Sequence, residues 1–169
     1  MLEQYIPSSD ELKELDVVED VLMVGYPSRN WDEANNQPIF RKGITATHPF
    51  LNFNGKKEFY IDAGVFSGSS GSPVVLFNRG GYTTKHGEYR TGETRIKLLG
   101  VFNKGSLSTD DVEVTIYKND KPYLYGDAET PNGLGVVIKA ERILEFKQPL
   151  QAKLEEIGKM LEQRKPYKP

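Results

Sequence analysis

The sequence predicts an antiparallel all-β domain that ends in a helix. Short apolar runs rich in Val, Ile, Phe and Tyr recur between clusters of Gly, Asn, Asp and Pro, as in β-sandwiches and barrels. No helical stretch separates these runs, which disfavours a parallel α/β fold. The apolar spacing changes to three and four residues only near the C-terminus. A length of 169 residues with 37% hydrophobic content is enough for one core, so we expect one domain.

Seven runs are expected to form strands, and they lie at residues 21–27, 38–47, 57–62, 72–77, 95–102, 111–117 and 134–139. Residues 78–93 are polar and contain glycines, which predicts a long hairpin or a surface loop. Residues 119–133 have the same character and are also expected to form a loop. The residues expected in the core are Val21, Val24, Ile39, Ile44, Val74, Leu76, Leu99, Val101, Val136 and Ile138.

An amphipathic helix is expected at the C-terminus, with Pro149 suited to its first turn. Its apolar residues are Ile143, Leu144, Phe146, Leu150, Leu154, Ile157, Met160 and Leu161. A stripe of this kind usually packs on the domain that carries it, and we expect packing here rather than binding to a partner. Its solvated side is expected to carry Glu155, Glu156, Lys159 and Arg164.

The composition excludes several classes of function. The net charge of −2, with no long run of one sign, argues against nucleic acid or an anionic membrane as a partner. The absence of cysteine excludes disulfides and Cys-ligated zinc, and two histidines do not make a metal cage, so neither metal nor cofactor is expected. No secretion signal or membrane span is recognisable. The compartment stays open between a bacterial cytoplasm and an exported protein whose leader has been lost.

The stretch "SGSSGS" at residues 67–72 has three possible interpretations. A flexible linker is disfavoured, because strand-like apolar runs flank it on both sides. A phosphate cradle or a G-x-S-x-G nucleophile elbow requires a following helix, yet Pro73 and a strand come next. The remaining interpretation is a tight turn whose backbone N–H groups point into one concavity, with Ser70 at its edge. Such a turn is an oxyanion hole, and it needs glycine at positions 68 and 71.

The stretch "GSSGSPVV" resembles the G-[DN]-S-G-[GS]-P signature of the chymotrypsin/trypsin-like serine peptidases. "VLMVGYP" followed by "RKGITAT" resembles the strands that open the second barrel of bacterial trypsin-like peptidases. "LLGVFNKG" resembles the substrate-flanking strand, and "GLGVVIKAERILEF" resembles the last strand and the terminal helix. These blocks stand in family order over roughly residues 17–160. The resemblance implies an antiparallel Greek-key β-barrel, the second of the family's two, followed by a C-terminal α-helix.

The domain boundaries follow from the same resemblance. Residues 1–16 would be an inter-barrel connection or an N-terminal extension, residues 17–147 the second barrel with its nucleophile loop, and residues 148–169 the helix and tail. Ser70 matches the nucleophile, and the amides of Gly68 and Ser70 match the oxyanion-hole donors. These roles imply peptide-bond hydrolysis through an acyl-enzyme on Ser70.

The resemblance also assigns the residues that would line the substrate cleft, and they are Gly64, Asn103, Lys104, Gly105 and Gly135. Gly64 would lie at the base of the P1 pocket and Gly135 on its wall. An uncharged base and small walls imply an apolar P1 side chain rather than Arg or Lys. A shift of register that brought Asp62 to the pocket would reverse this expectation. The substrate would be a peptide or protein.

A serine hydroxyl needs a base and a carboxylate that orients the base. In the resembling family a first barrel supplies both, and only 69 residues precede Ser70 here. His48 and His86 read as ordinary loop histidines, and neither Asp32 nor Asp62 pairs with them in sequence.

Three explanations stay open: a fragment or misassigned start of a longer peptidase, one half of a two-chain enzyme, or a degenerate domain that only binds an extended peptide or a partner protein. The missing barrel would come in cis or from a second chain, and an apolar face should mark its docking position. An ordinary turn in an unrelated β-sandwich is the plainest alternative.

Overall fold

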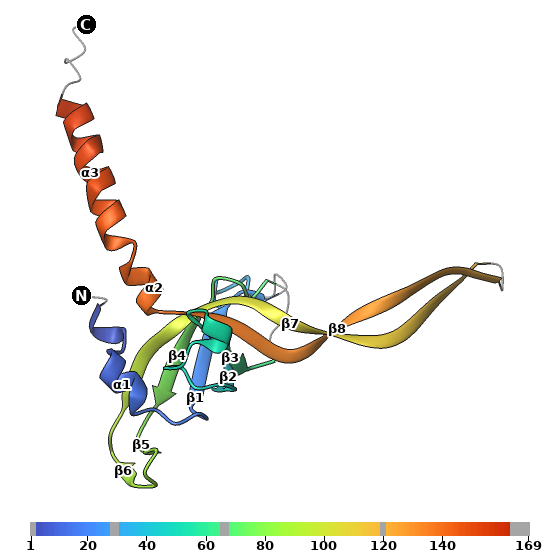
Figure 1. Cartoon of the computed structure of the whole chain (residues 1–169), viewed down its shortest axis with the longest axis horizontal. Coiled ribbons are helices and arrows are strands. Elements are labelled where there is room, and N and C mark those ends of the chain that lie inside the picture. The colour runs from blue at the N-terminus through green and yellow to red at the C-terminus, as the bar shows by residue number, and fades with distance from the viewer. Residues whose placement is uncertain (1–2, 28–30, 65–67, 119–120, 163–169) are drawn as a thin grey trace, which may run out of the picture.

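The computed structural model describes residues 3–27, 31–64, 68–118 and 121–162, and for residues 107–131, 161 and 162 it describes the backbone alone. The elements are η1 (Glu3–Tyr5), α1 (Ser9–Lys13), β1 (Asp20–Gly25), β2 (Ile39–Thr45), η3 (Phe53–Gly55), β3 (Glu58–Asp62), β4 (Pro73–Asn78), β5 (Gly81–Thr83), β6 (Tyr89–Thr91), β7 (Arg95–Lys118), β8 (Lys121–Lys139), α2 (Glu141–Leu144) and α3 (Lys147–Glu162). Figure 1 shows the strands gathered around one centre, with a long ribbon and the terminal helix leaving it in different directions.

Six antiparallel strands close into a barrel in the order β1-β2-β3-β8-β7-β4. The expectation of an antiparallel β-barrel followed by a C-terminal helix is therefore confirmed. Each barrel strand corresponds to an apolar run, because alternate side chains of a half-buried strand must enter the core. In β4, for example, Val74 and Leu76 are buried while Val75 and Phe77 are only half-buried.

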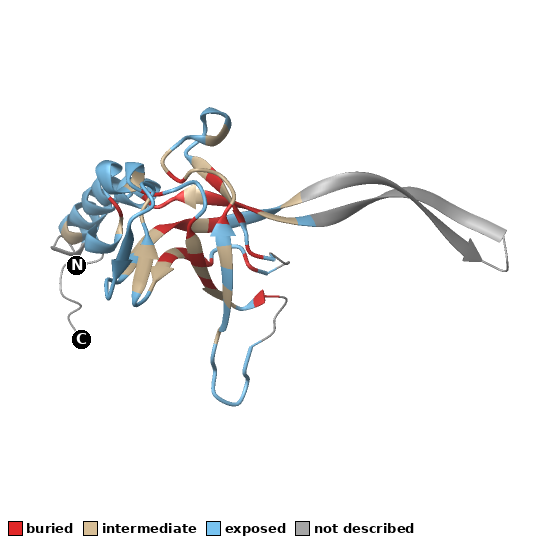
Figure 2. Ribbon diagram, turned by 90° about the horizontal axis from the view of Figure 1, so that it is seen from below, coloured by how far each residue is buried: buried red, intermediate tan, exposed pale blue. Residues whose placement is uncertain are grey.

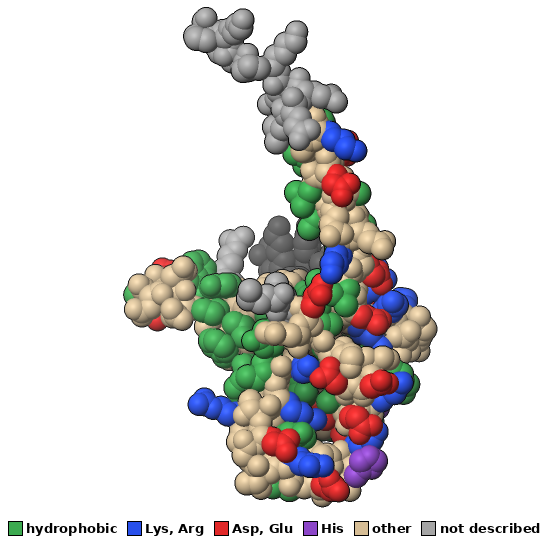
Figure 3. Space-filling view, turned by 90° about the vertical axis from the view of Figure 1, so that its left-hand side faces the viewer, with side chains coloured by type: hydrophobic (Ala, Val, Ile, Leu, Met, Phe, Trp, Pro, Cys, Tyr) green, Lys and Arg blue, Asp and Glu red, His purple; other side chains and the backbone are tan. Residues whose placement is uncertain are grey.

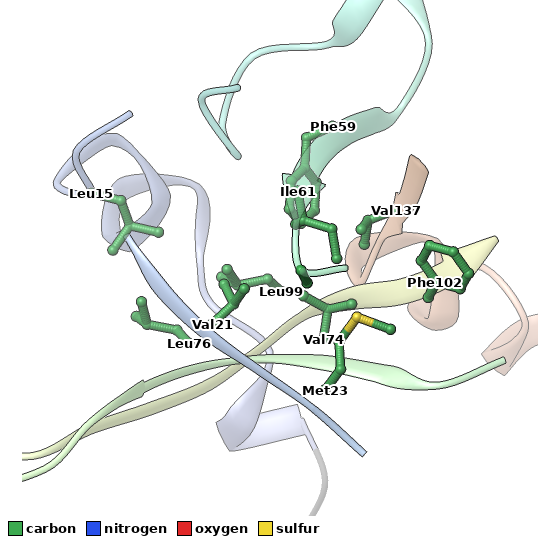
Figure 4. Packing of buried hydrophobic residues seen from close by; sticks show 11 residues of the cluster. Leu15, Val21, Met23, Phe59, Ile61, Val74, Leu76, Leu99, Phe102 and Val137 are labelled. Atoms are coloured by element: carbon green, nitrogen blue, oxygen red, sulfur yellow. The ribbon is translucent and has the colours of Figure 1, made fainter. Parts of the chain in front are cut away.

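The core fills the barrel and extends to the N-terminal segment, where Leu15 packs against it (Figure 4). Figure 2 shows buried residues concentrated in the barrel, whereas α3 is exposed along its length. Of the residues expected in the core, Val21, Val74, Leu76, Leu99 and Val136 are buried, and Val24, Val101 and Ile138 are half-buried. The core also contains residues that the sequence did not single out, and these are Met23, Phe59, Ile61, Phe102 and Val137.

Two of the core predictions are wrong, because Ile39 is 36% and Ile44 is 38% exposed. Ile44 lies on the strand face opposite to that of its buried neighbour Thr45, so the alternation of β2 turns it outward. Ile39 lies at the first position of β2, opposite Gly25 at the last position of β1.

The polar segments behave in two different ways. Residues 78–93 contain the β5–β6 hairpin, as predicted. The loop expected at 119–133 is wrong for its described part, because residues 121–133 belong to β8 and pair with β7 beyond the barrel. The runs 95–102 and 111–117, which were expected to be two strands, both belong to the single strand β7. Backbone hydrogen bonds between its two strands hold such a ribbon together without a core. A polar sequence is therefore compatible with strand structure there and does not mark the end of a strand.

The terminal helix occurs where the sequence predicts it, but its apolar residues are exposed. Leu150, Leu154 and Met160 are each more than half exposed, and Ile157 is 42% exposed. The expectation that this stripe packs on the barrel is wrong, because α3 points away from the barrel (Figure 1). Figure 3 shows hydrophobic side chains at the surface of this helix among charged ones. Arg164, which was expected on its solvated side, lies outside the described residues.

Candidate active site

The turn before β4 holds Ser70 between two glycines in the left-handed region of the backbone. Gly68 has a φ of 83° and Gly71 a φ of 89°. Non-glycine residues rarely adopt such angles, which explains why the predicted glycine positions matter here. A hydrogen bond from Ser72 N–H to the Ser69 carbonyl, 3.1 Å long, closes the turn.

Two further backbone bonds fasten the turn to β7. Gly71 N–H donates to the Phe102 carbonyl and Phe102 N–H donates to the Ser72 carbonyl, both at 2.8 Å. Ser69 is 2% and Ser72 is 7% exposed, whereas Ser70 is exposed. Among the described serines at positions 69, 70 and 72, only Ser70 is exposed.

The Ser70 hydroxyl donates a hydrogen bond of 2.7 Å to the carbonyl oxygen of Asn103. Asn103 lies at a register shift of β7, where Phe102 pairs with Val137 and Lys104 pairs with Val136. It is therefore an extra residue in its strand, a β-bulge, and bulges redirect local groups out of the sheet pairing. In this conformation the hydroxyl donates its hydrogen bond to a backbone carbonyl. In a catalytic arrangement a general base would accept that hydrogen bond instead.

The backbone amides of Gly68 and Ser70 donate to no acceptor among the residues that the structure describes. The amides of Gly71 and Ser72, one and two residues further on, are both used within the protein. Donors left unused beside an exposed hydroxyl are available to a developing oxyanion.

His48 lies at the opposite end of the barrel from Ser70. Gly25, paired with Ile39, faces the turn at residues 68–72 so closely that an added Cβ would lie 2.2 Å from Ser72 Oγ. Thr45 is six residues further along β2, about 20 Å away at the usual rise of a strand. His48 follows Thr45, and its Nδ1 accepts a bond of 3.2 Å from the N–H of Phe50.

The other titratable groups singled out in the sequence are also occupied or remote. His86 lies 4.0 Å from Glu14, beside the N-terminal segment. The side-chain amide and backbone N–H of Asn35 bond to the Asp32 carboxylate at 2.7 and 3.1 Å and lower its pKa. Asp62 is exposed at the end of β3. Within the described chain, no histidine and carboxylate pair lies beside Ser70.

Several substrate-lining residues that the sequence predicted are brought together. Gly135 pairs with Gly105 on one side and with Ile61 on the other. Lys104, next to the bulge, is exposed. Gly64 lies two residues after the end of β3, with a φ of 54°. Pairing therefore brings Gly105 and Gly135 together within β7 and β8, close to the end of β3.

Arg41 is a neighbour of this site that the sequence analysis missed. Its Nη1 donates a 2.7 Å bond to the Gly64 carbonyl, at the expected base of the P1 pocket. It pairs with Met23, whose side chain is in the core, so the half-buried guanidinium enters the barrel mouth from the inward side of β2. The sequence did carry a sign of this residue, because a basic side chain at an inward position of a strand needs a polar partner at the barrel's end.

The described residues contain no group of three or more metal-ligating side chains placed to hold an ion. Among the same residues, no helix is both long and apolar enough to span a membrane. Neither a family model nor a curated protein sequence matches the chain. The resemblance to serine peptidases therefore stays a prediction from the sequence motifs.

Proposed function

We propose that this chain is the nucleophile-bearing half of a serine endopeptidase, with Ser70 as the nucleophile. The observation that carries the proposal is the turn itself: an exposed serine between two left-handed glycines, beside two backbone amides that donate to no acceptor among the described residues. Oxyanion stabilisation needs donors that are fixed before the reaction, and the bonds between the turn and β7 supply that rigidity.

The strand order supports the finer assignment of the fold. Strands β1, β2 and β3 are consecutive neighbours, and β4 returns to lie beside β1. The spatial order β4-β1-β2-β3 fits a Greek key. A barrel of this kind, with a nucleophile turn leading into its fourth strand, agrees with the second barrel of trypsin-like peptidases that the motifs resemble.

The proposed reaction has two steps. Ser70 Oγ attacks the carbonyl carbon of the scissile bond, its proton passes to a general base, and the oxyanion is held by the amides of Gly68 and Ser70. The C–N bond then breaks, the amine leaves with a proton from that base, and an acyl-enzyme remains on Ser70. Water, deprotonated by the base, attacks the ester carbonyl, and the acid product and the free hydroxyl are released.

An extended peptide fits the edge of β7 beside the turn. Pairing between β4 and β7 ends at Pro73 and Val101, so Asn103 to Gly105 lie beyond the last paired position of β4. A substrate strand could add there by backbone hydrogen bonds. The Asn103 carbonyl would then exchange its bond to Ser70 for a substrate or base contact.

Arg41 extends the expectation for P1. A guanidinium bonded to the Gly64 carbonyl brings positive charge to the pocket base and disfavours Arg or Lys there. A panel of peptides varied only at P1 tests this in the active protein. Cleavage should follow apolar or acidic residues in preference to basic ones, and efficient cleavage after Lys would contradict it.

The proposal requires a histidine and a carboxylate from outside the described chain, supplied by a first barrel in cis or by a second chain. Labelling with a fluorophosphonate probe tests this. The 169-residue chain should label poorly, the protein extended upstream should label strongly, and Ser70→Ala should abolish the signal. Failure of both proteins to label would refute the peptidase assignment. Strong labelling of the short chain would show that a base within this chain already serves Ser70, which would contradict the proposal.

A second candidate function is a binding module that holds an extended peptide without cutting it. The bond between the Ser70 hydroxyl and Asn103, with no histidine beside it in the described residues, favours this alternative. Such a module would bind peptides equally well with Ser70→Ala and would never form an acyl-enzyme. Calorimetry of peptide binding, combined with the labelling above, separates the two functions.

A further inference from the structure

Lys139, the last residue of β8, holds its ammonium group inside the protein. The residue is only 4% exposed. Its Nζ donates hydrogen bonds of 2.6 Å to the Phe50 carbonyl and of 2.8 Å to the side-chain oxygen of Asn52. Both acceptors are neutral, and a lysine ammonium has three N–H donors. The third donor of Lys139 therefore has no acceptor within the described chain.

This buried ammonium also lacks a counter-ion. Several less buried lysines lie beside carboxylates, such as Lys97, whose Nζ is 2.6 Å from the Glu11 carboxylate. No carboxylate of the described residues lies within 4 Å of Lys139 Nζ. Removing a charge from water is costly, so buried charged groups are usually paired with an opposite charge. An anion from outside the described chain would supply the missing partner.

Lys139 lines a pocket of about 360 Å³, and Phe50 and Asn52, which accept its hydrogen bonds, line the same pocket. The other lining residues are Pro7, Ser9, Leu12, Leu51 and Glu141. A volume of this size with apolar walls and a few polar groups is typical of small-molecule sites. Phe50 is also bonded to His48, at the end of the barrel opposite to Ser70. The pocket is therefore separate from the candidate active site.

The lining of the pocket specifies the kind of anion. Lys139 supplies one positive charge, whereas Glu141, which pairs with Lys57 at 3.4 Å, would repel a second negative charge on the ligand. A phosphate monoester carries nearly two negative charges at neutral pH and is better bound by the fork of an arginine. The half-buried Leu12 and Phe50 offer apolar contact instead. At about 30 Å³ for each water-sized group, a pocket of 360 Å³ has room for roughly ten non-hydrogen atoms.

We propose that this pocket binds a small monocarboxylic acid with an apolar body, whose carboxylate accepts the third hydrogen bond of Lys139 Nζ. The apolar body contacts Leu12, Phe50 and Leu51, and the carboxylate becomes the counter-ion of the buried ammonium. A free alkyl acid and the C-terminal residue of a peptide share this chemistry. The site does not depend on Ser70, so it stands whether or not the chain is part of a peptidase.

Calorimetric titration of the 169-residue chain with hexanoate, hexanamide and N-acetyl-leucine tests the site. Hexanoate should bind saturably, and hexanamide, which has the same chain without the charge, should bind at least tenfold more weakly. Tighter binding of N-acetyl-leucine than of hexanoate would support the site and identify a peptide C-terminus as the source, and the reverse would identify a free alkyl acid. Absence of saturable binding by both acids, or equal binding of hexanamide, would overturn the proposal.

Two pairs of variants locate the binding. Lys139→Met keeps the length of the side chain and should weaken hexanoate binding at least tenfold, whereas Lys153→Met, exposed in α3, should not change it. Leu51 is 60% exposed, so its variants leave Lys139 and the core in place even if Lys139→Met does not fold. Leu51→Asp adds a carboxylate to the pocket and should weaken binding severalfold more than Leu51→Asn. Unchanged binding in Lys139→Met, or equal effects of the two Leu51 variants, would refute the site.

The ionisation of Lys139 gives a readout that a merely structural role would not move. Burial lowers its pKa, while Glu141 acts to raise this pKa and Lys57 acts to lower it further. A carboxylate beside the ammonium favours the charged form. Saturating hexanoate should therefore raise the pKa of Lys139 in an NMR titration of its side-chain carbons, and hexanamide should not. An unchanged pKa of Lys139 with hexanoate bound would overturn the proposed contact.

Discussion

The packing of β1 against the turn at residues 68–72 can be tested by Gly25→Ala. A Cβ at position 25 would lie 2.2 Å from Ser72 Oγ and 3.4 Å from Ser72 Cβ. Ordinary contact begins at 3.4 Å, so the overlap with the hydroxyl is 3.4 − 2.2 = 1.2 Å. Overpacking of this kind costs about 1–3 kcal/mol, and Ser72 is too buried to move freely into solvent. We therefore expect Gly25→Ala to lower the free energy of unfolding by that amount.

The double mutant identifies the cause of the loss. Ser72→Ala removes the hydroxyl and leaves only the tolerable Cβ contact, so Gly25→Ala should be nearly neutral in that background. Urea denaturation of the wild type, both single variants and the double variant gives a coupling energy of about 1–3 kcal/mol. Additivity within about 0.5 kcal/mol would show that the turn does not pack against β1 as described. Gly158→Ala, far away in α3, serves as the additive control with Ser72→Ala.

Three further predictions concern single residues. A Cβ at Gly71 would meet no atom within 4 Å, so only the φ of 89° opposes Gly71→Ala, which should lower the free energy of unfolding by about 1–2 kcal/mol in urea denaturation. Gly158→Ala, also in open space but in a helix, should instead stabilise the protein by up to about 1 kcal/mol. Thr45→Val should lower the free energy of unfolding by about 2–3 kcal/mol in the same assay, because the Glu19 N–H loses its acceptor, the buried Thr45 Oγ1 at 2.8 Å. An unchanged denaturation midpoint would contradict this. Burial lowers the pKa of Lys139 from its ordinary value of 10.5, so the unfolded chain binds more protons between the two pKa values and stability gains as pH rises. Relative to Lys139→Met, the wild type should gain stability as the pH rises toward 10.5, and a constant difference would refute the cause.

Alternation of apolar residues was sufficient to predict the strands and much of the core. Val74 and Leu76 alternate with their neighbours over one short run, and this periodicity allows only one face to enter the core. Glycines at 68 and 71 were likewise predictable as turn residues, because few other residues adopt their backbone angles. Both the alternation and the glycine positions depend only on neighbouring residues, and they can therefore be predicted from the sequence.

The failures arise where position in the barrel decides burial. Ile39 and Ile44 have core-like side chains, yet the barrel's open end and the outward face of β2 leave them exposed. The stripe of α3 has the spacing of a packed helix, but packing depends on which surface the helix meets. Periodicity reports which residues share a face and cannot report what covers that face.

The sequence by itself determined an antiparallel β domain, a terminal helix and a glycine-flanked Ser70, because strand period, helix period and left-handed backbone are properties of neighbouring residues. Only the tertiary structure decided that His48 lies at the far end of the barrel, that Arg41 reaches Gly64, and that the Ser70 hydroxyl meets the Asn103 carbonyl. These contacts join segments up to 33 residues apart, and the closure of the barrel brings them together.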